Sequence, residues 1–166
     1  MRIAAIALLA GTLALAGCGG EDSITVETED GGEATFTAES DDGDTTVRIS
    51  GDDGGSINID AGENVSVDLP DGWSVYPGAK VVSSVTLQQA DGSGVLVIME
   101  TEEAAEDMLE FYRKQAEAAG LEIKSEMKSV NTLVIASDAN AATTFQFSAT
   151  RDADKTTGQL LVGSDS

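Results

Sequence analysis

Carboxylates are the most abundant chemically active groups in this chain. The sequence holds 30 Asp and Glu against nine Lys and Arg, a formal net charge of −21. Carboxylate oxygens bind calcium, so the Asp- and Gly-rich clusters are candidate sites for that ion. None has the Asp-x-Asp-x-Asp-Gly loop with a Glu at its twelfth position, or the nonapeptide Gly-Gly-x-Gly-x-Asp repeat. We interpret them as solvated turns and predict no metal site; they are Glu29–Gly32, Asp41–Asp44 and Asp52–Gly55.

Residues that carry catalysis are sparse. The chain has no histidine, which removes the usual general base at neutral pH, the Ser-His and Cys-His nucleophile pairs and imidazole metal ligands. Gly92-Ser93-Gly94 lacks the pattern of a nucleophile elbow, and acids on turns lack the cleft that glycoside hydrolysis needs. A Ser-Lys pair stays open, although no motif points to one. The sequence therefore predicts a protein that is not an enzyme, with no catalytic residue and no cofactor.

The single cysteine, Cys18, lies where covalent modification is expected. It follows an apolar run, Ile3–Ala16, behind the basic Arg2, and this order is typical of a secretory signal. The run is too short to cross a bilayer. Residues 15–18, Leu-Ala-Gly-Cys, resemble the lipobox of bacterial lipoproteins. The resemblance implies cleavage between Gly17 and Cys18, a thioether-linked diacylglycerol on Cys18 and acylation of the new amino terminus.

The resemblance also implies a location in the cell. Loss of residues 1–17 leaves eight bases against 30 acids, a formal charge of −22. That charge excludes nucleic acid as a partner and argues against a polybasic second anchor. The lipid on Cys18 is therefore expected to hold the protein at the membrane by itself. Gly19 stands where an Asp would resemble the inner-membrane retention signal. We therefore expect the periplasmic face of the outer membrane in a Gram-negative cell, or the outer leaflet of the plasma membrane in a Gram-positive one.

The elements after the anchor begin with an acidic, Asp/Gly-rich segment. Residues 18–22 are expected to form a lipidated tether, and residues 23–70 contain short stretches of apolar and polar alternation between Asp-Gly clusters. This combination is a strong hairpin signal, although low apolar content and high charge are also typical of disordered spacers. The alternation favours a β-meander over a partly disordered stem. Its apolar positions are Ile24, Val26, Ala34, Phe36, Ala38, Val47, Ile49, Ile57, Ile59, Val65 and Val67.

Residues 71–163 are predicted to form an α+β domain, with a tail at 164–166. Thr101 is expected to cap a helix that ends before Gly120, because an apolar stripe recurs between them at helical spacing. The stripe makes Tyr112 a core residue with Phe111 beside it. The order of elements predicts an antiparallel sheet with one helix packed on a face. Strands are expected at 81–89, 95–99 (buried on both faces), 121–127, 133–136, 143–150 and 159–162.

The stretch from Leu69 to the end also resembles a domain of uncharacterised bacterial lipoproteins. The shared features are the sequence Val-Tyr-Pro-Gly-Ala at 75–79, the hairpin that follows it, the Thr-Glu-Glu helix start at 101–103, Phe111-Tyr112 and Gly120. An acidic Asp/Gly-rich segment ahead of this domain is part of the resemblance. The resemblance implies a fold and a location in the cell envelope, and it implies no activity.

Two aromatic residues form the candidate binding surface. Trp73 and Tyr76 precede a Pro77-Gly78 turn that leads into the first strand of the domain. They are expected either to close the core with their polar tips near water, which we favour, or to form an exposed aromatic site.

Together these features predict a lipid-anchored cell-envelope protein, most consistent with a non-enzymatic binding or scaffolding module that faces an envelope protein partner. The alternative is a divalent-cation-responsive surface or adhesion-type protein, whose acidic segment stiffens when its carboxylates are neutralised. A hydrolase without histidine is the third and least favoured.

Overall fold

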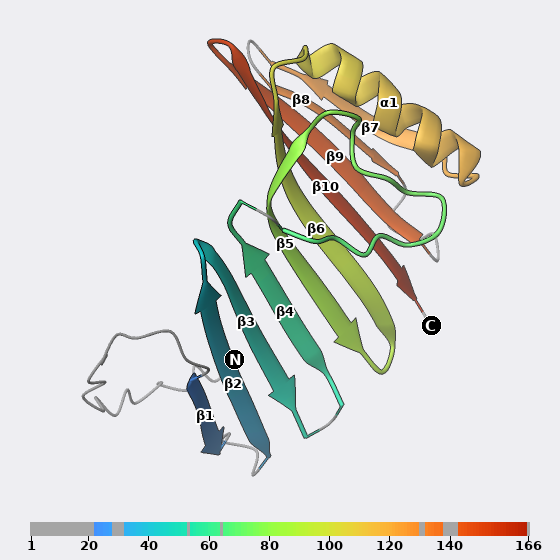
Figure 1. The fold of residues 1–166 in the computed structure, drawn as a ribbon. Helices are drawn as coiled ribbons and strands as arrows, with labels where there is room; N and C mark the ends of the chain where they lie inside the picture. The colour runs from blue at the N-terminus through green and yellow to red at the C-terminus, as the bar shows by residue number, and fades with distance from the viewer. Residues whose placement is uncertain are drawn as a thin grey trace.

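The computed structural model describes residues 22–27, 32–52, 54–63, 65–129, 132–137 and 143–165. These residues form one ten-stranded antiparallel sheet in the order β1-β2-β3-β4-β5-β6-β10-β9-β8-β7 (Figure 1). The strands are β1 (Asp22–Glu27), β2 (Glu33–Asp41), β3 (Asp44–Gly51), β4 (Ser56–Ala61), β5 (Lys80–Gln89), β6 (Gly92–Thr101), β7 (Ile123–Lys128), β8 (Thr132–Ser137), β9 (Thr143–Asp152) and β10 (Lys155–Asp165).

The topology consists of two meanders that meet at β6. From β1 to β6, each strand pairs with the next one in the chain. The chain then passes through the helix α1 (Ala105–Ala118) to β7 at the far edge, and hairpins return it to β10, which pairs with β6. Strand pairing is antiparallel throughout the described sheet, as short hairpin connections require.

The helix begins later than its sequence suggests. The expected cap at Thr101 is wrong, because Thr101 still belongs to β6, where it pairs with Thr156 of β10. Ala104 is the residue before the first turn, and the acids in that turn are Glu106 and Asp107. The predicted stripe is confirmed, since the helix buries Ala105, Met108, Leu109, Tyr112 and Ala116.

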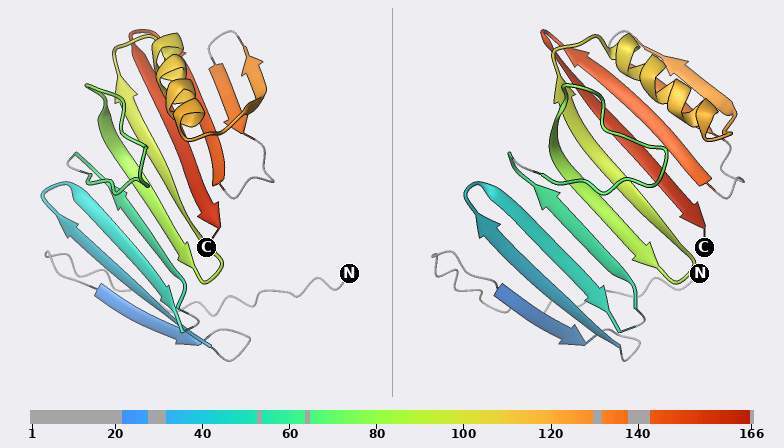
Figure 2. Two further views of the ribbon diagram at one scale, coloured as in Figure 1. Left: turned by 90° about the vertical axis from the view of Figure 1, so that its right-hand side faces the viewer. Right: turned by 45° about the vertical axis from the view of Figure 1, so that its right-hand side comes forward.

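A long connection covers the same face as the helix. Residues 65–79 lead from β4 to β5 and lie on the side of the sheet that carries α1 (Figures 1 and 2). Backbone N–H of Tyr76 donates to Tyr112 Oη of the helix at 3.0 Å, and Gln115 Nε2 donates to Ser74 Oγ at 2.9 Å. We call the side covered by α1 and residues 65–79 the front face, and the opposite side the open face.

The core lies under this cover. Alternate residues of β6, β9 and β10 point to the front face, where they meet the inner stripe of α1 and Trp73. Phe145, Phe147 and Ala149 form the inward row of β9. The fully buried side chains include Val97, Met99, Met108, Tyr112, Ile135, Phe145, Phe147, Leu160 and Val162.

The predicted α+β class is wrong. The described part of the chain is mainly β: a single continuous sheet with one 14-residue helix. The acidic segment does form a β-meander, but β4 pairs with β5 through residues 56–61 and 83–88, so the sheet runs on past the expected boundary at 70/71. Hydrogen bonding along a sheet continues wherever an edge strand finds a partner, and the turn signals at 69–72 mark a loop that crosses the front face.

One irregularity interrupts β5. The pairing of β5 with β6 shifts between Val81 and Ser83, which leaves Val82 as an extra residue. The carbonyl of Val82 accepts a hydrogen bond from Gly62 N–H at 3.1 Å, just after β4 ends. Because of this bulge, Val81 pairs with Met99 on the front face, whereas Val85 pairs with Leu96 on the open face.

Candidate functional site: the open sheet face

The N-terminal strands turn their apolar side away from the helix. Residues directly opposite one another in a sheet share a face, and one such row joins five strands. A second row runs parallel to it. The first row is Ile24, Phe36, Ile49, Ile57 and Leu87, and the second is Ala38, Val47, Ile59, Val85 and Leu96. We call these ten residues, with Val26 and Ala34 beside them, the apolar rows.

No described helix or strand covers the apolar rows. The helix contacts β7, β8, β9 and β10, and residues 65–79 pack on the front-face core. Exposure is greatest at the sheet edge, where Ile24 is 47% exposed, Val26 43% and Phe36 38%. The rows from β3 to β5 are half-buried. A contiguous uncovered apolar surface of this kind is typical of an interaction site.

Charge is segregated across the same strands. From β2 to β5 every acid occupies a front-face register position, as Glu39 and Asp60 illustrate by pairing with Thr46 and Ser84. Arg48 of β3 also pairs on the front face, opposite Asn58. The front face here is polar, with Thr46 Oγ1 donating to Asp60 Oδ1 at 2.7 Å. The N-terminal sheet is therefore amphipathic, with an acidic side and an apolar side.

A groove of about 600 Å³ lies over part of the first apolar row. Ala34, Ile49, Ile57 and Leu87 supply its apolar floor, and the turns that join β3 to β4 and β5 to β6 form its polar rim. Its volume and its mixture of an apolar floor with a few polar groups suit a small ligand or an inserted side chain.

The two predicted aromatic residues differ in position. Trp73 is 9% exposed, and its ring stacks on Phe145 with centroids 4.8 Å apart, so it packs into the core. Tyr76 is half-buried and meets Phe111 edge-on at 5.2 Å. The structure therefore does not bring Trp73 and Tyr76 together as one exposed aromatic surface.

Tyr112 links the helix, the loop and the sheet. Its ring lies 4.3 Å from that of Phe147, and its hydroxyl donates to Met99 Sδ at 3.2 Å while it accepts from Tyr76 N–H. Burial raises the pKa of Tyr112 strongly, and the hydrogen bond from the Tyr76 backbone lowers it in part. Burial, with the charges of Asp107 and Glu103, also raises the pKa of Tyr76. Both phenols are neutral at physiological pH and suit packing.

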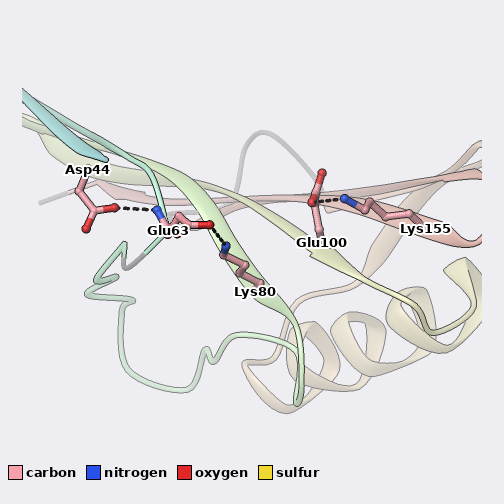
Figure 3. A network of polar contacts seen from close by, with 5 residues as sticks. All are labelled: Asp44, Glu63, Lys80, Glu100 and Lys155. Atoms are coloured by element: carbon pink, nitrogen blue, oxygen red, sulfur yellow. Dashed lines mark hydrogen bonds and ion pairs between the residues drawn. The ribbon is translucent and has the colours of Figure 1, made fainter. Parts of the chain in front are cut away.

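The charged groups near the start of β5 are paired. Lys80 Nζ lies 3.3 Å from Glu63 Oε1, and Lys155 Nζ lies 2.8 Å from Glu100 Oε2 (Figure 3). Asp44 Oδ1 accepts from Glu63 N–H at 2.6 Å (Figure 3). These side chains are largely solvent-exposed, where ion pairs contribute little stability. Lys80, Glu100 and Lys155 line a shallow pocket, and because both lysines are paired, it does not gather unpaired positive charge for an anion.

Other predicted sites fall partly outside the described residues. Gly17 and Cys18, the cleavage and lipidation positions, lie there, as do Glu29 and Asp53 of the acidic clusters. Among the described residues, no group of three or more potential ligands could hold a metal ion. In the same part of the chain, no helix has the length and apolarity to cross a membrane.

Comparison with known proteins adds one finding. A family model described as START domain-like matches residues 81–157, from β5 into β10. START-like domains are typically ligand-binding and not catalytic, so the match is compatible with a non-enzymatic binding role. The match covers less than half of the chain and leaves out β1–β4. Neither the curated proteins nor the solved structures contain a significant match to the chain.

Proposed function

We propose that this protein is a lipid-anchored, non-enzymatic binding module of the cell envelope, and that the apolar rows are its binding surface. The observation that carries the proposal is the uncovered, acid-free apolar side of β2–β5, with its groove of about 600 Å³. The START domain-like match supports a binding role in general terms. The lipobox resemblance at residues 15–18 supports the anchor.

The binding surface is tested with a neutral hydrophobic dye. Nile red is titrated into residues 18–166 carrying Cys18→Ser, so that no lipid is attached. Ile49→Asp places a charge on the groove floor, whereas Ser50→Asp places the same charge on the front face of the same strand. We expect Ile49→Asp to weaken dye binding about tenfold or more, since a charge is costly to desolvate in an apolar site. Ser50→Asp should leave the affinity within about twofold of the parent.

Equal affinities for the two variants would refute the apolar rows as the binding surface. Far-UV circular dichroism and thermal unfolding of both variants establish that they fold. If Ile49→Asp unfolds, Ile49→Ser and Ser50→Ala provide a milder pair with the same contrast.

The anchor is tested separately in cells. With Cys18 intact the protein should sediment with membranes, and Cys18→Ser should move it to the soluble fraction. Retention of the Cys18→Ser variant on membranes would contradict the lipid anchor. Calcium at millimolar concentration should leave the circular dichroism of the soluble chain unchanged. A calcium-induced gain of strand would favour the divalent-cation-responsive alternative.

A further inference from the structure

We infer that the apolar rows rest on the bilayer that holds the protein's own lipid, so that β1–β3 lie against its headgroup region with the open face down. This inference rests on the proposed lipid anchor and specifies what the proposed binding surface meets. The length of the tether, the gradient of exposure and the segregation of charge support this placement.

The tether is short, so it keeps the start of β1 close to the membrane. Only residues 19–21 separate Cys18 from Asp22, where β1 begins. At no more than about 3.6 Å per residue, the four steps from Cys18 to Asp22 reach about 14 Å. The start of β1 therefore stays within about 14 Å of the lipidated residue, whatever course the tether takes.

The exposed apolar side chains are concentrated at this tethered edge. Three of the five large apolar residues exposed in the described chain, Ile24, Val26 and Phe36, lie on β1 and β2 and face the open side. The other two are Met127 on β7 and Leu161 on β10. The residues of the apolar rows on the next two strands, β3 and β4, are half-buried. Apolar side chains that penetrate the headgroup boundary gain the free energy of leaving water, which favours contact by this edge first.

Charge sets which side faces the lipid. With the open face down, Glu33, Glu39 and Asp60 point toward water on the front face. With the sheet inverted, the same carboxylates would be pressed against the headgroups and would lose hydration. Only the orientation with the open face down therefore combines apolar contact with hydrated acids on β2–β4; on β1, Asp22 pairs with Ala38 and shares the open-face register.

A second copy of the chain is the competing occupant. Two sheets stacked face to face lie about 10 Å apart, which is close to the distance over which salt screens charge. Each mature chain carries eight bases and 30 acids, so such a dimer would bring together two strongly negative proteins. A neutral lipid surface imposes no such repulsion.

The test measures the depth of single labelled positions. The lipid occupies the thiol of Cys18, the only native cysteine, so one introduced cysteine is the only reactive thiol. Full-length lipidated protein with Phe36→Cys or Thr37→Cys is labelled with NBD and placed in phosphatidylcholine vesicles that carry nitroxide-labelled lipid. Phe36 is on the open face, and Thr37 is its neighbour on the front face.

We expect a blue-shifted NBD emission at position 36 and at least about threefold stronger quenching there than at position 37. Water-like emission with equal quenching at both positions would overturn the inference. If Phe36→Cys impairs folding, Ile24→Cys and Thr25→Cys give the same contrast on β1.

Two further measurements show whether a negative result contradicts the lipid anchor or only the contact with the bilayer. Flotation of the vesicles and the intact mass report whether Cys18 carries lipid; a protein that is unlipidated overturns the anchor and this inference together. A lipidated, floating protein with a water-exposed position 36 overturns the inference alone. The unlipidated Cys18→Ser chain with the same label is measured without vesicles; a blue shift that grows with protein concentration would identify a second copy as the occupant and overturn the bilayer.

Discussion

Both halves of the sheet have strands of alternating apolar and polar residues, but the apolar residues point to opposite faces in the two halves. In β6, β9 and β10 the alternating apolar residues point to the front face, where α1 and residues 65–79 bury them. In β1–β4 they point to the open face, which no described element covers. One half thus makes a core from its own chain, whereas the apolar side of the other half is uncovered by any described element. Stability and binding are therefore expected to respond to different halves.

The largest expected difference comes from removing one phenylalanine in each half. Phe147 is fully buried against Tyr112, whereas Phe36 is 38% exposed on the open face. Phe147→Ala should lower the free energy of unfolding by about 3–5 kcal/mol, because it removes buried area and leaves a cavity. Phe36→Ala should cost less than about 1 kcal/mol in the unlipidated chain. Urea unfolding followed by Trp73 fluorescence measures both; equal losses would mean that the two halves share one core.

A smaller effect is expected where the halves join. Gly62 has φ +148°, and a Cβ there would lie 2.1 Å from Asp44 Oδ1 and 2.7 Å from Asp44 Cα. Gly62→Ala should therefore cost about 1–3 kcal/mol through backbone strain and displacement of β3. Hydrogen exchange should accelerate in β3 and β4 and stay unchanged in β9 and β10.

Gly54→Ala is the matched control, because Gly54 also has positive φ (+83°) but open space around its Cβ position. It should cost less than Gly62→Ala. Uniform acceleration of exchange across all strands in the Gly62 variant would contradict a separable N-terminal half.

The smallest expected effect is the change of stability with pH that Tyr112 causes in the buried half. Burial raises the pKa of Tyr112 above its ordinary value of 10.0, so the folded protein keeps this proton after the unfolded chain has lost it. This stabilisation is complete below pH 10 and declines as pH rises above 10, by up to about 1.4 kcal/mol per pH unit. Tyr112→Phe should cost about 1 kcal/mol at pH 7 and should flatten this decline.

Unfolding in urea at pH 9, 10 and 11 measures the slope. Tyr76→Phe is the control, because Tyr76 is half-buried and should leave most of the slope in place. A slope that survives Tyr112→Phe would show that another group dominates the alkaline loss of stability.

Sequence periodicity predicted most individual elements correctly, because each depends on local spacing. The stripe from Ala105 to Ala116 predicted the helix, and Gly120, with φ +78°, ends it. The acidic alternation predicted the strands that became β1–β4. Pairing between β4 and β5 was not predictable in the same way, because it joins residues more than 20 positions apart across a loop rich in turn signals. That missing link is why the predicted fold class was wrong.

The candidate site was predictable in its residues but not in its role. Ile24, Phe36 and Ile49 were recognised as apolar positions, yet alternation alone does not say whether another element will cover that side. Residue type likewise left open whether Trp73 closes the core, the favoured interpretation, or faces solvent; the structure packs its ring against Phe145. Residue type gives chemistry, whereas exposure depends on packing between distant segments. The lipid anchor at Cys18 stays a prediction.

The extra residue in β5 has a consequence for how the chain changes sides. With a strict period of two, Val81, Val85 and Leu87 would all point the same way. Because Val82 is inserted, Val81 packs against the core on the front face, whereas Val85 and Leu87 lie on the open face. A single strand therefore contributes apolar side chains to both faces of the sheet, because one residue of added length turns its first residues toward the helix-covered side.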